Sequence, residues 1–261
     1  MHNFDFVKPS SVADAVSALK AEDAQALGGG QTLIPTMKQR LAAPAVLVSL
    51  TGITEMKGVK RAGDAVEIGG ATTHAEVAKE AASHYPALAA LATGIGDPAV
   101  RNRGTIGGSL ANNDPAADYP AAALASGATV VTNAREIAAD DFFQGLFSTA
   151  LEEGEIITAV RFPMPEKAAY AKFVQPASRF ALTGAFVAKF ASGVQVAITG
   201  AGEDGVFRWS EAEQALSQNF SADAVAGLAV PEDGMIGDIH GTPAYRANLV
   251  RVMTQRAVRT A

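Results

Sequence analysis

The chain has 261 residues, 48% hydrophobic and 18% charged, which is enough for a sizeable core and for two compact units. Its formal net charge of -6 argues against a nucleic-acid function driven by phosphate neutralisation. The lack of cysteine excludes disulfides, thiolate zinc sites and cysteine-ligated iron–sulfur clusters within these residues.

Nothing in the sequence predicts a membrane segment or a secretory leader. No run approaches the roughly 18 apolar residues of a membrane span. Residues 1–5 lack the basic and apolar regions of a signal peptide. We therefore expect a globular protein with no membrane span, located in the cytoplasm.

Residues up to about 160 predict a mixed α/β unit. Ser11 and Thr73 each begin a helix-capping pattern, and Pro86 suits the first turn of another helix. Strand-like apolar runs occupy residues 45–50, 66–68 and 156–160.

Pro163 and Pro165 predict the connection to a second unit, because they end a strand and stiffen the chain. After them, residues 185–190 and 194–198 flank a short turn and predict a hairpin, to which residues 206–209 add a third strand. Helices are predicted at residues 211–216, at 222–228 and from 245 onward.

Two widely separated glycine-rich stretches carry the strongest functional signal. The first reads Ala-Leu-Gly-Gly-Gly-Gln-Thr-Leu at residues 26–33, and the second reads Thr-Ile-Gly-Gly-Ser-Leu-Ala-Asn-Asn-Asp-Pro-Ala-Ala-Asp at residues 105–118. Glycine lets backbone N–H groups turn toward an anion with no Cβ in the way. Asp114 and Asp118 are acceptors for ligand hydroxyls or amides. Phosphate-binding loops with hydroxyl acceptors indicate a dinucleotide site.

Other interpretations of these motifs are weaker. Residues 94–99 match Gly-x-Gly-x-x-Ala, but a predicted helix precedes them and a proline interrupts them, which favours a structural loop over a Rossmann site. Residues 107–111 resemble a serine nucleophile elbow, yet His240, its candidate partner, falls in a loop that looks exposed. The histidines show no metal-ligand spacing, so we predict no metal site. Asp114 and Asp118 could instead cap helices, since each lies near a proline at a predicted helix start.

Together, the two stretches resemble the FAD-binding medium subunit of the molybdenum hydroxylases, the family of xanthine dehydrogenase and carbon monoxide dehydrogenase. Residues 28–38 are similar to its Ala-Gly-Gly-Thr-x-Leu-x-Pro-x-Met-Lys motif. Residues 105–120 are similar to its Thr-Ile-Gly-Gly-Asn-x-Ala-x-x-Asp-Pro-x-x-Asp-x-Pro motif. Weaker similarity extends over nearly the whole chain, at residues 154–157, 170–172 and 245–246.

The resemblance implies an α+β fold. A two-subdomain FAD-binding domain of the para-cresol methylhydroxylase type is expected at residues 1–165, with its two α/β subdomains divided near residue 55 and FAD between them. A smaller α+β domain of the carbon monoxide dehydrogenase flavoprotein type, a three-stranded antiparallel sheet plus helices, is expected at residues 166–261. The chain is somewhat short for the family, which suggests trimmed loops in this second domain.

The resemblance also implies a cofactor site without any catalytic residue. In such subunits both glycine loops bind the pyrophosphate region, the position of Ile95 lies near the flavin ring, and the position of Asp118 contacts the cofactor. Ile157 and Lys172 match further flavin-contacting positions. Ser109 stands where asparagine is usual, an exchange that affects affinity more than function. The predicted FAD-binding residues are Leu27, Gly28, Gly29, Gly30, Gln31, Thr32, Leu33, Ile95, Thr105, Gly107, Gly108, Ser109, Asp114, Asp118, Ile157 and Lys172.

By the same resemblance, the chain is one subunit of a heterotrimer or of a dimer of heterotrimers. A large subunit oxidises the substrate at a molybdenum cofactor, and a small subunit carries two 2Fe–2S clusters. This subunit passes electrons from noncovalently bound FAD to an external acceptor. The sequence of this chain does not identify the substrate.

Two other functions stay open at this level. An independent FAD oxidase of the same fold should bring its own acid–base residues and often a His or Cys tether for the flavin, which neither glycine loop contains. A pure binding module, in which the glycine loops are only turns, should be colourless when purified.

Overall fold

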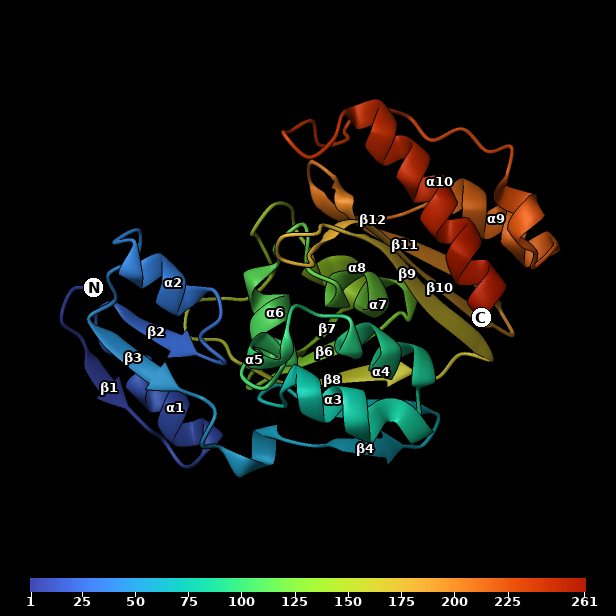
Figure 1. Cartoon of the computed structure of the whole chain (residues 1–261). Helices are drawn as coiled ribbons and strands as arrows, with labels where there is room; N and C mark the ends of the chain where they lie inside the picture. Colours follow the sequence, from blue (N-terminus) through green and yellow to red (C-terminus); the bar gives the residue numbers. More distant parts are fainter.

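Three β-sheets follow one another along the chain in the computed structural model, which describes residues 1–261 (Figure 1). The first sheet has the strand order β1-β3-β2 and is parallel. The second has the order β4-β5-β8-β6-β7, and the third the order β12-β11-β10-β9; both are antiparallel. The predicted α+β class is therefore confirmed.

The first sheet forms a small layer with two helices at the N-terminal end of the chain. The predicted cap at Ser11 is present, since its side chain accepts a hydrogen bond from the Asp14 N–H and begins α1. Apolar residues of α1 pack against β3, with Ala15 and Val48 fully buried. The elements of this layer are β1 (Asp5–Val7), α1 (Val12–Ala18), β2 (Ala24–Leu27), α2 (Leu33–Lys38), β3 (Val46–Ser49) and the 3-10 turn η1 (Thr54–Met56).

The second sheet carries most of the helices and the largest apolar core. The predicted capping box is present, because Thr73 and Glu76 satisfy each other's backbone N–H groups at the start of α3. The strands are β4 (Val59–Ala62), β5 (Ala65–Gly69), β6 (Thr129–Thr132), β7 (Glu136–Ala138) and β8 (Ile157–Pro163). The helices are α3 (His74–Glu80), η2 (Ala81–Ser83), α4 (Pro86–Thr93), α5 (Pro98–Arg101), α6 (Ile106–Asn112), α7 (Tyr119–Ala125) and α8 (Ala139–Phe142).

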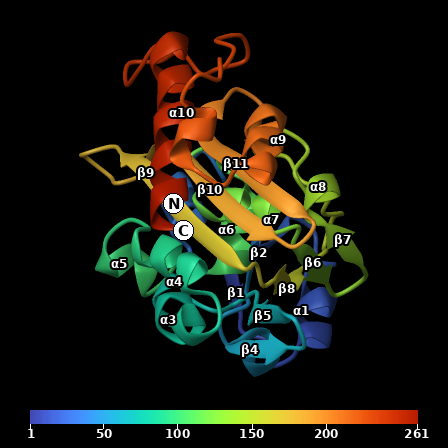
Figure 2. The same ribbon diagram turned by 90° about the vertical axis from the view of Figure 1, so that its right-hand side faces the viewer.

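The third sheet lies between α7 on one face and α9 and α10 on the other (Figure 2). Every residue of α7 is buried, because it packs against the second-sheet core and the third sheet at once. The elements of this part are β9 (Lys167–Val174), β10 (Ala181–Phe190), β11 (Gly193–Gly202), β12 (Gly205–Arg208), α9 (Ser210–Gln218), η3 (Ala222–Val225) and α10 (Pro243–Thr260).

Two sequence-based expectations need correction in this part. The sheet has four strands rather than three, since β9 also pairs with β10. Strand β9 was missed because its sequence Lys-Ala-Ala-Tyr-Ala-Lys-Phe-Val has no run of β-branched residues. The helix expected at residues 222–228 is only the 3-10 turn η3. None of the helices combines the length and apolar character that a membrane crossing requires.

Candidate functional site

A cavity of about 850 Å³ lies where loops from all three sheets meet. Its wall includes the loop after β2, the region from α5 to α7, the segment before β8, and residues 178–180 between β9 and β10. All of the predicted FAD-binding residues except Lys172 line this single cavity. Loops about 75 residues apart in the sequence are thus brought together, because Gly28 and Gly29 lie directly against residues 103–105.

The two glycine loops touch each other through their backbones. A Cβ on Gly29 would lie 1.9 Å from the carbonyl oxygen of Arg103 and 2.5 Å from the Cα of Gly104. Gly29 is therefore required for the approach of the two loops, and not only for access to a ligand. Gly30 adopts φ +72°, which lets the chain turn into α2.

Gly108 has a different environment, in the first turn of α6. The Thr105 side chain accepts a hydrogen bond from the Gly108 N–H at 3.2 Å. A Cβ on Gly108 would meet only Thr105 Oγ1, at 3.0 Å, and would otherwise extend into open space where the residue lines the cavity. This is the arrangement expected for a glycine that leaves room for a ligand.

Asp118 lines the cavity as part of a buried polar cluster. Its carboxylate accepts a hydrogen bond from Tyr170 Oη at 2.6 Å and pairs with Lys172 Nζ at 2.9 Å. Burial raises the pKa of Asp118, while Lys172 and Tyr170 act in the opposite direction. Lys172 Nζ also donates to the carbonyls of Gly94 and Arg179. Lys172 thus reaches the cavity wall through Asp118 rather than by lining it.

The helix-capping alternative fails for Asp118. It precedes α7, but its side chain makes no capping hydrogen bond. Asp114 accepts a hydrogen bond from the Ala116 N–H at 2.9 Å, within a turn. The two aspartates therefore differ: one is part of a buried ion pair, and the other stabilises a local turn at the cavity wall.

His74 is a cavity residue that sequence reasoning missed. Its side chain is buried and lies against the Tyr119 ring, with centroids 5.3 Å apart. Burial and, secondarily, the charge of Arg101 lower the pKa of His74 to about 4, so the ring is neutral at physiological pH. Its Nδ1 is buried without a protein hydrogen-bond partner. The sequence around Thr73 predicts only the start of a helix. It gives no sign that the next residue, His74, is buried in the cavity wall.

Other wall residues were also missed, because they lie in irregular segments with no periodic pattern. They are apolar, glycine or charged residues that only the tertiary structure brings to the cavity. They include Gly70, Gly104, Leu151, Glu155, Ile156, Arg179 and Phe180. Only Glu155 and Ile156 fall in a stretch, residues 154–157, whose similarity was noted from sequence.

Comparison with known proteins bears out the resemblance. Residues 2–165 match the family described as "FAD binding domain in molybdopterin dehydrogenase". The chain is 36% identical to the carbon monoxide dehydrogenase medium chain of Afipia carboxidovorans, over 99% of this chain and 96% of that relative. It is 34% identical to the nicotine 6-hydroxylase medium subunit of Paenarthrobacter nicotinovorans, over 97% of this chain and 95% of that relative.

A solved structure supports the same family. The CO dehydrogenase from Oligotropha carboxidovorans matches with a TM-score of 0.89 at 33% identity, over 99% of this chain and 97% of that chain. The relatives are thus dehydrogenase or hydroxylase subunits. From the family match over residues 2–165, the whole-chain identity and the common fold, this chain belongs to the FAD-binding medium-subunit family of the molybdenum hydroxylases.

Proposed function

We propose that this chain is the FAD-carrying electron-transfer subunit of a cytoplasmic molybdenum hydroxylase. It receives electrons from the 2Fe–2S clusters of a small partner subunit and passes them to an external acceptor. A large partner subunit oxidises the substrate at its molybdenum cofactor. The observation that carries the proposal is the single cavity in which both glycine loops meet Asp118.

The residues present fit FAD. Gly108 leaves open space at the cavity wall, and the buried Nδ1 of His74 has no partner within the protein. We propose that residues 27–33 and 105–109 hold the pyrophosphate and that the Asp114 and Asp118 carboxylates accept hydrogen bonds from the cofactor. Ile95 and Ile157 supply apolar wall for the flavin ring.

Bound FAD supplies the redox chemistry, namely the uptake and release of electrons. The residues of this chain bind and orient it without covalent attachment, and the ion pair with Lys172 fixes the orientation of the Asp118 carboxylate. We also propose that residues 1–165 are the FAD-binding domain, divided near residue 55, and residues 166–261 the C-terminal domain. The succession of sheets and the match over residues 2–165 support this division.

Two glycine substitutions should separate loop packing from cofactor binding. Gly29→Ala places a Cβ 1.9 Å from the Arg103 carbonyl oxygen, and we expect a loss of about 1–3 kcal/mol in the free energy of unfolding. Gly108→Ala should leave the unfolding free energy within about 1 kcal/mol of wild type, but weaken FAD binding by roughly tenfold or more. Urea unfolding and titration of the apoprotein with FAD measure the two quantities.

Gly227→Ala is the matched control, because nothing lies within 4 Å of the added Cβ. If Gly108→Ala binds FAD like wild type, Gly108 is only a helix residue.

Electron flow tests the function itself. The full chain, reconstituted with FAD, is mixed under anaerobic conditions with its iron–sulfur subunit, previously reduced with dithionite and freed of excess reductant. We expect the visible absorption of oxidised flavin to be lost when this subunit is added, and to persist when the large subunit is added alone. Failure of the chain to retain FAD would refute the assignment.

The competing function is an independent oxidase. A panel of phenols, alcohols and hydroxy acids, added to the FAD-loaded chain alone, should leave the flavin oxidised. Rapid flavin reduction by any of these donors would favour the oxidase over the electron-transfer subunit.

A further inference from the structure

Residues 151–157 form a seam between the cores of the first and second sheets. Ile156 is 2% exposed and packs in the cluster that contains Ala15 and Val48, whereas Ile157 is 4% exposed and packs in the core of the second sheet. Both residues also line the cavity, together with Leu151. This segment therefore sets how one wall of the cavity sits between the two halves.

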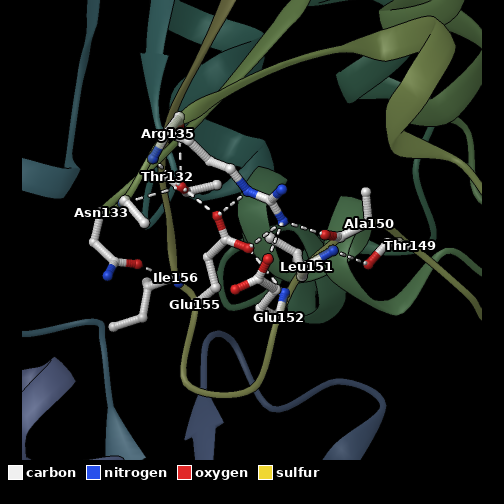
Figure 3. Close-up of polar contacts among 10 residues, drawn as sticks. Thr132, Asn133, Arg135, Thr149, Ala150, Leu151, Glu152, Glu155 and Ile156 are labelled. Carbon is white, nitrogen blue, oxygen red and sulfur yellow. Dashed lines mark hydrogen bonds and ion pairs between the residues drawn. The ribbon is translucent and has the colours of Figure 1, made fainter.

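Residues 151–156, which precede β8, form no helix or strand that could hold the seam in place. The carboxylate of Glu155 supplies the missing restraint, with four hydrogen bonds and a side chain only 4% exposed. Its Oε1 accepts from Thr132 Oγ1 at 2.6 Å and from Arg135 Nε at 3.1 Å. Its Oε2 accepts from Arg135 Nη2 at 3.1 Å and from the Glu152 N–H at 2.8 Å. Figure 3 shows the Arg135 and Glu155 side chains pointing toward each other.

The β6–β7 turn holds both ends of the seam. Arg135 Nη2 donates to the Ala150 carbonyl at 2.7 Å, just before the segment. Asn133 binds Ile156 twice: its Oδ1 accepts from the Ile156 N–H at 2.7 Å, and its N–H donates to the Ile156 carbonyl at 3.1 Å. A turn outside the cavity thus fixes the backbone that carries the cavity wall (Figure 3).

The electrostatics agree with this geometry. The hydrogen bond from Arg135 is the main cause that lowers the pKa of Glu155, to about 2, with smaller contributions from Thr132 and the Glu152 N–H. The carboxylate is therefore ionised throughout the physiological range and always available to Arg135. Such bidentate arginine–carboxylate pairs fix orientation as well as distance.

We propose that Arg135 and Glu155 are positioning residues for FAD: their pair fixes the 151–157 segment so that Leu151, Ile156 and Ile157 form a cofactor-shaped wall. Arg135 acts from outside the cavity, since it does not line it. The inference rests on the proposed function, because it concerns the same cofactor.

The test uses the full chain with Glu155→Gln, Arg135→Met and the double variant. Glutamine keeps the shape of the side chain but turns an NH₂ group toward N–H donors, and methionine removes the guanidinium. We expect each single variant to bind FAD roughly tenfold to a hundredfold more weakly, the range for a lost charged hydrogen bond. The double variant should be no weaker than the worse single variant, because both remove the same restraint.

Two further measurements distinguish positioning from general stability. The visible circular dichroism of saturated variants should differ from wild type, because the flavin environment has moved. The control is Glu67→Gln in the same sheet, which removes a charge that pairs with Lys60 on β4 and Arg161 on β8, none of them a cavity residue. It should leave FAD affinity and the dichroism unchanged.

Binding is measured well below the unfolding temperature of every variant. Wild-type affinity and dichroism in folded Glu155→Gln and Arg135→Met would overturn the positioning role while leaving FAD binding by wild type intact. Additive losses in the double variant would also overturn it. If Glu155→Gln fails to fold, Arg135→Met decides, since the arginine side chain is 43% exposed and its removal leaves less buried space. A wild-type chain that does not bind FAD would refute the proposed function itself.

Discussion

Asp118→Ala should destabilise the protein by about 3–5 kcal/mol, the cost of leaving a buried charge without its partner. The Lys172 side chain is only 8% exposed, and without Asp118 its ammonium group keeps only the carbonyls of Gly94 and Arg179. Tyr170 Oη also loses its acceptor. Because α7 packs against the third sheet, the loss should loosen contact between the two parts of the chain. Urea unfolding at neutral pH measures the effect.

The double variant Asp118→Ala/Lys172→Met should recover much of this stability, because the uncompensated charge is removed as well. FAD affinity should not recover with it, since the carboxylate acceptor is still missing. Asp114→Ala is the control and should cost less than about 1 kcal/mol, because that side chain accepts only one hydrogen bond, from the Ala116 N–H. Equal losses in Asp114→Ala and Asp118→Ala would contradict the ion-pair interpretation.

The pH dependence of stability should depend strongly on His74. Its pKa is lowered from 6.5 to about 4 in the folded protein, so the folded state favours the neutral ring. Between pH 6.5 and about 4 the unfolded chain binds a proton at His74 that the folded chain does not. The resulting stability is present above pH 6.5, and about 3 kcal/mol of it is lost as the pH falls to about 4.

The measurement is a series of urea unfolding curves across this pH range. His74→Gln removes the titrating group, so the slope of unfolding free energy against pH should flatten in that window. His240→Gln is the matched control, because His240 lies exposed in a loop, against Phe180 and Gln175. The same pH slope in wild type and His74→Gln would show that His74 is not held neutral by burial.

Local chemistry explains which parts of the fold were predictable. Ser11 and Thr73 start helices through contacts within three residues, so the pattern alone located α1 and α3. Strand β9 could not be found in this way, because its place depends on pairing with β10 rather than on its own residues. The α+β class followed from the family resemblance as well as from the pattern.

The candidate site, like the fold, was only partly predictable from the sequence. The glycine loops were recognisable because a backbone that must approach closely leaves few alternatives to glycine. His74 and Glu155 were not recognisable, since their importance comes from burial and from partners such as Tyr119 and Arg135 that lie far away in sequence. Sequence similarity marked the stretch that contains Glu155, but only the three-dimensional structure gave it a role.

The cavity wall is drawn from stretches that begin at Gln25 and end at Phe180. A growing polypeptide therefore cannot complete the cavity until Phe180 has left the ribosome, even though the first glycine loop emerges much earlier. The Gly29 loop must wait for Arg103 and Gly104, against which it packs. The cavity is thus completed late in biosynthesis, and chains interrupted before residue 178 lack the side of the cavity that residues 178–180 supply.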